Sequence, residues 1–163
     1  FSHLCPGPSH LPIVRTHGFA MTAYKLLTRY PWWSVDSATW TKVGAFGGIM
    51  VPHLRDGKFT YEEEPYNISV SNDSPNSAQK GKHYTSLSDA ERGVVDRWLD
   101  HIGLKLGTTD EGTGEVIERG VATHHSERKV ANLLFFEGLR EWLPKYPWPF
   151  RPARQVRRMG TAQ

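Results

Sequence analysis

The segment from Thr16 to Trp40 constrains the fold of this chain more than any other stretch. Together with the residues just before it, it predicts a short strand over Pro12 to Thr16 and a helix over about Thr22 to Arg29. A second strand over Trp32 to Val35 follows the helix. Strand, helix and strand in this order form a βαβ unit, whose strands run parallel in a sheet that helices cover. The sequence therefore predicts an α/β protein.

Two short polar motifs follow the predicted strands. His17 and Gly18 come after the first strand, and Asp36 and Ser37 come after the second. In parallel sheets of this kind, the functional residues gather at the C-terminal ends of the strands. We therefore interpret these two strand ends as the candidate site.

The motifs His17-Gly18-Phe19 and Val35-Asp36-Ser37 resemble those of the tRNA-guanine transglycosylase superfamily, the queuine and archaeosine tRNA-ribosyltransferases. The resemblance covers roughly residues 12 to 52 and is closest to the phage and bacterial branch that inserts 7-deazaguanine bases into DNA. It implies a TIM barrel, of which these would be the last βα units. It also implies a pentosyltransferase in which Asp36 is the nucleophile at the ribose C1′. His17, Gly18, Phe19 and Ser37 would then bind the substrate.

With 163 residues, the chain is shorter than a complete TIM barrel, which needs at least about 200. We therefore expect the C-terminal part of a TIM barrel followed by a β-hairpin and two helices, with the missing N-terminal part of the barrel as a partner. The family's second aspartate, a general acid/base, would lie in that part. The predicted divisions are the barrel strands in 1–52, a hairpin and helical extension in 53–144 and a basic tail in 145–163.

The single cysteine, Cys5, excludes a cysteine-based zinc site within this chain. The tRNA-acting members of the family carry a cysteine-rich zinc site after the nucleophile strand, and no such cluster follows Asp36. DNA is therefore expected as the substrate in preference to tRNA, with no metal and no cofactor. No apolar run approaches about 18 residues and no signal-peptide pattern is present, so we expect a cytoplasmic protein without a membrane partner.

Four arginines crowd the last thirteen residues with no acid among them, and they suit either contact with nucleic acid or a tail that only adds solubility. The net charge is +3 and the calculated pI is about 9.1. The expected phosphate contacts are Lys42, Arg151, Arg154, Arg157 and Arg158. Lys42 opens a glycine-containing segment that is expected to run as a loop into a strand over Phe46 to Val51.

The middle of the chain contains clear local signals. Asp56-Gly57 lies between two β-rich runs, Ile49–Leu54 and Phe59–Tyr61, and predicts a β-hairpin. Ser88 to Glu91 form a capping box that opens a helix to about Ile102.

A last helix is predicted over Ser126 to Leu143. Its expected core face contains Val130, Leu133, Leu134, Glu137 and Trp142-Leu143. Residues 72–85 and 108–120 are rich in turn formers and are expected to be flexible loops. The acidic run Glu62 to Glu64 is interpreted as a solvated turn.

Two other functions remain open from the sequence. The chain could be a nucleic-acid-binding module that has lost its chemistry, or a structural piece that completes a barrel from another chain. Asp36 could also serve only to cap the turn that Ser37 begins.

Overall fold

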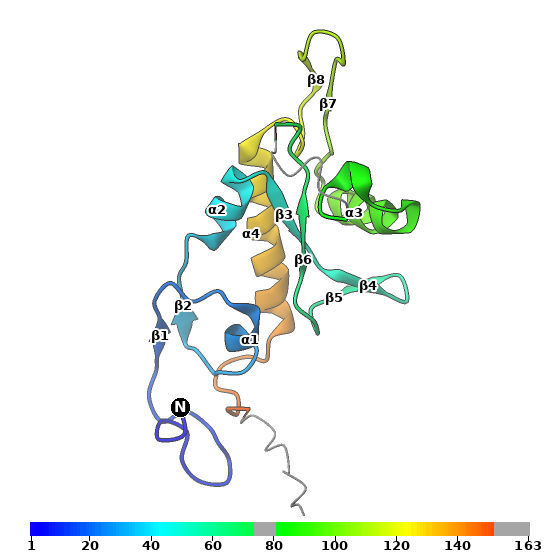
Figure 1. Ribbon diagram of the computed structural model, residues 1–163. Helices are drawn as coiled ribbons and strands as arrows, with labels where there is room; N and C mark the ends of the chain where they lie inside the picture. Colours follow the sequence, from blue (N-terminus) through cyan, green and yellow to red (C-terminus); the bar gives the residue numbers. More distant parts are fainter. Residues whose placement is uncertain (74–80, 152–163) are drawn as a thin grey trace, which may run out of the picture. The chain divides into compact units, whose positions relative to one another are not determined.

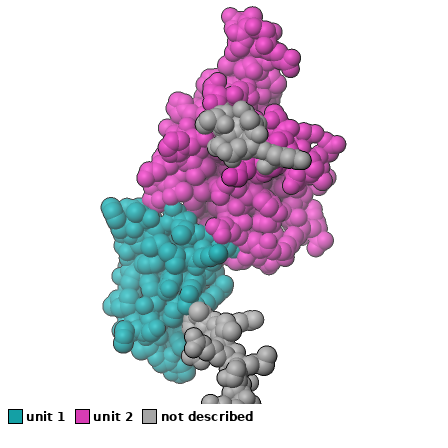
Figure 2. All heavy atoms as spheres, viewed as in Figure 1, with its two compact units in different colours: residues 1–36, 144–163 teal, residues 37–143 magenta. Residues whose placement is uncertain are grey.

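The described residues, 1–73 and 81–151 of a computed structural model, form a mixed α/β protein. They contain four α-helices, their strands pair as four two-stranded sheets, and none of these sheets closes into a barrel (Figure 1). The contacts divide the chain into two compact units, which Figure 2 colours separately. Unit 1 is Phe1–Asp36 with Pro144–Gln163, and unit 2 is Ser37–Leu143. This division differs from the boundaries at 52/53 and 144/145 that the sequence suggested.

Unit 1 contains the predicted βαβ order in reduced form. Strand β1 (His17–Gly18) pairs in parallel with β2 (Ser34–Val35), and helix α1 (Tyr24–Leu27) lies between them in the chain. The strand predicted over residues 12–16 is wrong, because pairing begins only at His17. Helix α1 is a single turn: its N-cap residue makes no side-chain hydrogen bond, and Pro31 prevents it from continuing.

Aromatic rings form much of the core of unit 1. The Tyr30 and Phe150 rings stack with centroids 5.3 Å apart, and the Phe1 ring lies 4.7 Å from Tyr30 and 4.8 Å from Trp32. The backbone N–H of Phe150 donates to the carbonyl of His10 at 2.8 Å. The segment that follows the last helix therefore packs against the N-terminal residues through both ring and backbone contacts.

The centre of unit 2 is an antiparallel pair of strands packed against two helices (Figure 1). Strand β3 (Gly48–Val51) pairs with β6 (Tyr66–Ser69), and α4 (His125–Trp142) contacts both β3 and α2 (Thr39–Ala45). The loop expected from Lys42 is wrong, since Lys42 lies in α2. Threonine, valine and glycine have weak helix propensity, so the sequence of α2 does not predict a helix. Tertiary packing stabilises it instead.

The core face of α4 differs from the predicted one. Val130, Leu133 and Trp142 are 43%, 42% and 37% exposed. The buried face has helical spacing but includes two polar residues, and its members are Arg128, Ala131, Asn132, Phe135 and Leu139. The apolar pattern predicted the wrong face because the polar members satisfy backbone groups of other elements.

The buried Arg128 links α4 to two other segments. Its Nε donates to the carbonyl of Gly44 at 2.7 Å, and its Nη1 donates to that of Val121 at 2.8 Å. Burial lowers the pKa of the guanidinium, and the charge of Asp73 opposes this shift. Gly44 permits the close approach of α2, since a Cβ there would lie 3.0 Å from the backbone nitrogen of Lys129.

The local signals in the middle of the chain give the predicted elements. Strands β4 (His53–Arg55) and β5 (Lys58–Thr60) form a hairpin, and Asp56 and Gly57 at its turn have φ of 48° and 74°. Both turn residues are left-handed, as in the type I′ turn of an Asp-Gly hairpin. Helix α3 (Asp89–His101) begins with the Ser88–Glu91 capping box, which is therefore confirmed.

A second hairpin replaces part of the loop expected over residues 108–120. Strand β7 (Thr108–Thr109) pairs antiparallel with β8 (Val116–Glu118), and the hairpin projects from the rest of unit 2 (Figure 1). Asp110 orders the turn, because its Oδ1 accepts hydrogen bonds from the backbone N–H groups of Gly112 and Thr113 at 2.9 and 2.8 Å. These bonds, led by that of Thr113, lower the pKa of Asp110.

Candidate functional site

Asp36 directly follows β2 and is fixed by the loop after β1. Its Oδ1 accepts the backbone N–H of Ala20 at 2.7 Å. Its own N–H donates to the carbonyl of Gly18 at 3.1 Å, and its carbonyl accepts from the N–H of Met21 at 2.8 Å. The side chain is nevertheless about half exposed. The carboxylate is therefore held in place and remains accessible to solvent.

His17 lies beside this carboxylate and contacts the neighbouring strand. Its Nδ1 is 2.9 Å from the hydroxyl of Ser34, and its Nε2 is 3.7 Å from Oδ2 of Asp36. The structure thus brings together His17 and Asp36, which the sequence placed at two strand ends. Ser34 was missed by the sequence analysis, although period-two alternation along β2 places it on the same face as Asp36.

Gly18 and Phe19 have different surroundings from one another. Gly18 is buried, and a Cβ there would lie 2.9 Å from Cβ of Met21 and 3.1 Å from Cγ1 of Val35. The absence of a side chain allows this close packing. Gly18 contacts Asp36 through its carbonyl, which accepts the N–H of Asp36. Phe19 is 82% exposed, and Ala20 after it has a left-handed φ of 54°.

Ser37 begins the turn into α2. Its hydroxyl accepts the N–H of Thr39 at 3.0 Å and lies 2.8 Å from the Thr39 hydroxyl. The Asp36 carboxylate instead accepts a bond from the β1–α1 loop. Ser37 therefore makes the turn contacts that had been considered as an alternative role for Asp36. Lys42 is an exposed residue of α2.

Arg151 is the one predicted tail contact within the described residues. It is exposed, its Cζ lies 5.6 Å from the ring centroid of Trp148, and its carbonyl accepts from Nε of Arg29 at 3.0 Å. The other predicted phosphate contacts of the tail lie outside the described residues, and they are Arg154, Arg157 and Arg158.

The two units have opposite charge. The residues of unit 1 include eight of the twenty Lys and Arg residues and one of the seventeen acidic residues, a net charge of +7. The remaining twelve cations and sixteen acids give unit 2 a net charge of −4. The single acid of unit 1 is Asp36. The candidate carboxylate thus belongs to the basic unit, and the positive charge of this unit would attract an anionic polymer.

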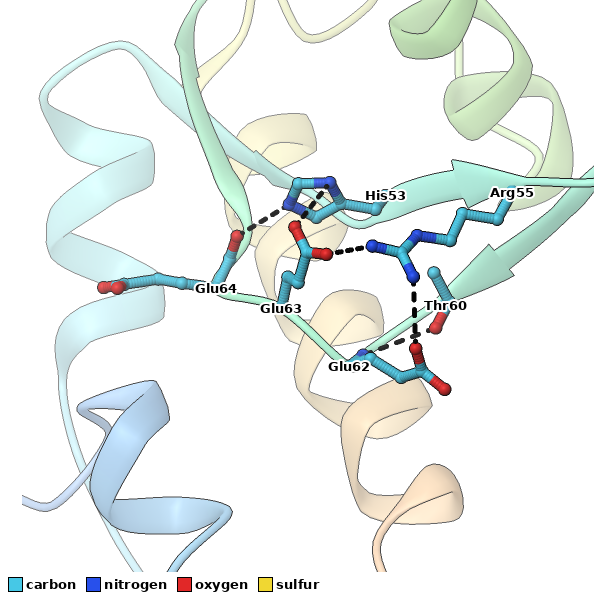
Figure 3. Close-up of polar contacts among 6 residues, drawn as sticks. All are labelled: His53, Arg55, Thr60, Glu62, Glu63 and Glu64. Carbon is cyan, nitrogen blue, oxygen red and sulfur yellow. Dashed lines mark hydrogen bonds and ion pairs between the residues drawn. The ribbon is translucent and has the colours of Figure 1, made fainter. Parts of the chain in front are cut away.

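A second polar cluster joins the β4–β5 hairpin to the acidic run (Figure 3). Arg55 pairs with both Glu62 and Glu63. His53 lies with Nδ1 3.6 Å from Oε2 of Glu63 and Nε2 3.0 Å from the carbonyl of Glu64. The carboxylates of Glu62 and Glu63 are about half exposed, and surface pairs of this kind contribute about 0–1 kcal/mol. This cluster connects two segments and offers no pair of buried acids for catalysis.

Across residues 1–73 and 81–151, no group of three or more His, Cys, Asp or Glu side chains is arranged to hold a metal ion. The helices in these same ranges include none that combines the length and apolar character needed to cross a membrane. Cys5 is a buried free thiol.

The chemistry open to the strand-end site follows from its geometry. A carboxylate with one oxygen bound by a backbone N–H and the other beside an imidazole can act as a nucleophile or as a base. Comparison with protein-family models, with curated proteins and with solved structures finds no match for this chain.

Proposed function

We propose that this chain supplies the nucleophile of a transglycosylase that exchanges guanine for a 7-deazaguanine base in DNA. In this proposal, β1 and β2 are adjacent strands near the end of a TIM barrel, and the remaining strands pair with them. Asp36 is the nucleophile. The observation that supports this role most directly is the half-exposed Asp36 carboxylate, held at the C-terminal ends of two parallel strands by the Ala20 N–H.

The exchange takes place in two displacements at C1′ of the nucleotide. An Asp36 oxygen first forms a bond to C1′ while the bond from C1′ to guanine N9 breaks, and the electron pair leaves with N9. A general acid protonates the departing guanine. The corresponding nitrogen of the 7-deazaguanine then attacks C1′, loses its proton to a base and releases the carboxylate. This is the double displacement of retaining glycosidases, and it needs no oxidant or reductant.

The charge of unit 1 supports a nucleic acid as the partner. Its net charge of +7 attracts phosphates, and the exposed Phe19 directly precedes Ala20, whose N–H binds the Asp36 carboxylate. A base in duplex DNA must leave the helix before its C1′ can be attacked, and exposed aromatic rings stack on such flipped bases. We propose that Phe19 has this role and that His17, Gly18 and Ser37 shape the surrounding loops.

Trapping the covalent intermediate tests the proposed chemistry. The full-length protein is mixed with guanine-containing duplex DNA in the absence of an incoming base and then denatured. We expect an adduct whose mass equals protein plus oligonucleotide less guanine, and the adduct should disappear when a 7-deazaguanine base is supplied before denaturation. An adduct that forms with RNA but not with DNA would support the proposed chemistry and contradict DNA as the substrate. DNA binding without any adduct would instead favour the binding module that lacks chemistry.

Salt dependence tests the contribution of the C-terminal arginines. Binding constants for DNA are measured from low to high salt, and the variant replaces Arg151, Arg154, Arg157 and Arg158 by glutamine. Each lost phosphate contact should reduce the slope of log K against log salt by about 0.9. The matched control makes four exposed Arg→Gln replacements in unit 2, at Arg55, Arg97, Arg119 and Arg140. Equal slopes for the two variants would contradict a role of the tail in binding.

A further inference from the structure

Three side chains on one face of the β1–β2 ladder form a connected series. His17 and Ser34 are partners in the parallel register, and Asp36 lies two residues after Ser34. Residues two apart on a strand point to the same face, so the three side chains meet there. The series runs from the Ser34 hydroxyl to Nδ1 of His17 at 2.9 Å, and from Nε2 of His17 to Oδ2 of Asp36 at 3.7 Å.

The two carboxylate oxygens of Asp36 have different surroundings. Oδ1 accepts the N–H of Ala20 at 2.7 Å, whereas Oδ2 faces the imidazole of His17. The bond from the Ala20 N–H occupies Oδ1 and so distinguishes the two oxygens. Oδ2 is therefore the oxygen that is presented for bond formation.

The proton arrangement on His17 follows from what each neighbour can donate. A carboxylate only accepts, so a favourable contact with Oδ2 requires a proton on Nε2. In the neutral ring, Nδ1 then has a lone pair, and the Ser34 hydroxyl donates to it. In the charged ring Nδ1 has a proton, and the same hydroxyl accepts a hydrogen bond from it. A serine hydroxyl can therefore form a hydrogen bond with Nδ1 in both states. The tautomer whose only proton is on Nδ1 is unfavourable, because the lone pair of Nε2 would then face the carboxylate.

We infer that Ser34 is a positioning residue: its contact with Nδ1 holds the His17 ring so that Nε2, where the carboxylate favours the proton, faces Oδ2 of Asp36. The orientation of the ring is a property of the chain itself, and only its catalytic consequence rests on the proposed function. During exchange, Oδ2 loses its negative charge when it bonds to C1′ and regains it when the incoming base displaces it. An N–H aimed at Oδ2 stabilises that returning charge, so it favours the second displacement.

Nitrogen-15 NMR of the His17 ring tests the inference without reference to activity. The spectra are recorded on the full chain at a pH where titration of His17 itself shows a neutral ring. We expect the wild-type ring to have its proton on Nε2. Ser34→Ala frees the ring to turn Nδ1 toward the carboxylate, so it should add a substantial population with the proton on Nδ1. Ser34→Thr retains the hydroxyl and should restore the wild-type pattern. Ser2→Ala, at an exposed serine of the same unit, is the matched control and should leave the His17 signals unchanged.

A neutral wild-type ring with its proton on Nδ1, or a Ser34→Ala ring identical to the wild type, would overturn the inference. In either case the trapping experiment could still succeed, so failure of this inference is separate from failure of the proposed function. The kinetic consequence is measured as the decay of the trapped adduct when 7-deazaguanine base is added. Ser34→Ala should slow this decay by about tenfold, and Ser34→Thr should return it to the wild-type rate. Equal decay in all three proteins would contradict the catalytic consequence.

Discussion

Asparagine in place of Asp36 is expected to abolish the proposed base exchange while the fold stays intact. An amide oxygen is a far weaker nucleophile than a carboxylate, and loss of a nucleophile in a covalent mechanism commonly lowers the rate by a factor of about 10⁴ or more. The fold should persist because the amide oxygen of asparagine can still accept the N–H of Ala20, which now bonds to Oδ1 at 2.7 Å. The side chain is about half exposed, so the exchange of atoms leaves no buried group without a partner.

The measurement is incorporation of labelled 7-deazaguanine base into DNA, with thermal unfolding followed in parallel. Asp56→Asn is the matched control, because Asp56 is an exposed aspartate in a left-handed turn that asparagine also tolerates. It should retain full exchange. Retained exchange in Asp36→Asn would remove the nucleophile assignment, and simultaneous loss of the thermal transition would show that Asp36 mainly maintains the loop after β1.

Sequence predicted those parts of the fold that local chemistry specifies. The Ser88–Glu91 capping box and the Asp56-Gly57 turn each act within a few residues, and α3 and the β4–β5 hairpin form where these signals lie. Helix α2 and the β7–β8 hairpin were missed, because threonine and glycine content resembles that of a loop. Helix α2 depends on its contacts with the distant α4, whereas the β7–β8 hairpin is local and its turn is ordered by Asp110.

The sequence predicted part of the candidate site. The βαβ order placed His17 and Asp36 at neighbouring strand ends, and the structure brings their side chains to 3.7 Å. Ser34 was missed because its period-two relation to Asp36 becomes informative only once the register pairs Ser34 with His17. Gly18 was predicted to bind substrate. Its surroundings explain why this position is a glycine, because it packs closely against Met21.

The wrong face of α4 has a specific physical cause in Asn132. This fully buried side chain accepts the N–H of Met50 at 2.7 Å with Oδ1 and donates Nδ2 to the carbonyl of Gly48 at 3.2 Å. The N–H of Met50 and the carbonyl of Gly48 point to the same edge of β3, since the two residues are two apart. The carboxamide therefore occupies the place of a peptide group from a neighbouring strand. Hydrophobic patterning predicts an apolar residue at such a buried position. It cannot recognise a polar side chain that takes the place of a peptide group.

Replacing Asn132 by leucine is expected to destabilise unit 2 by about 3–4 kcal/mol, a large part of the stability of a typical domain. Leucine has the same number and branching of side-chain heavy atoms but no polar group. The main loss therefore comes from the unpaired Met50 N–H and from the carbonyls of Gly48 and Trp40, to which Nδ2 donates at 3.2 Å. Urea unfolding should show a lower midpoint with an unchanged slope. Asn67→Leu is the matched control: Asn67 is exposed and pairs with Met50 in the β3–β6 register, and its replacement should change stability by less than about 0.5 kcal/mol. Equal midpoints for the two variants would mean that the free edge of β3 does not depend on Asn132. A selective loss in Asn132→Leu would establish that one side chain of α4 completes the hydrogen bonding of a strand edge that the fold leaves open.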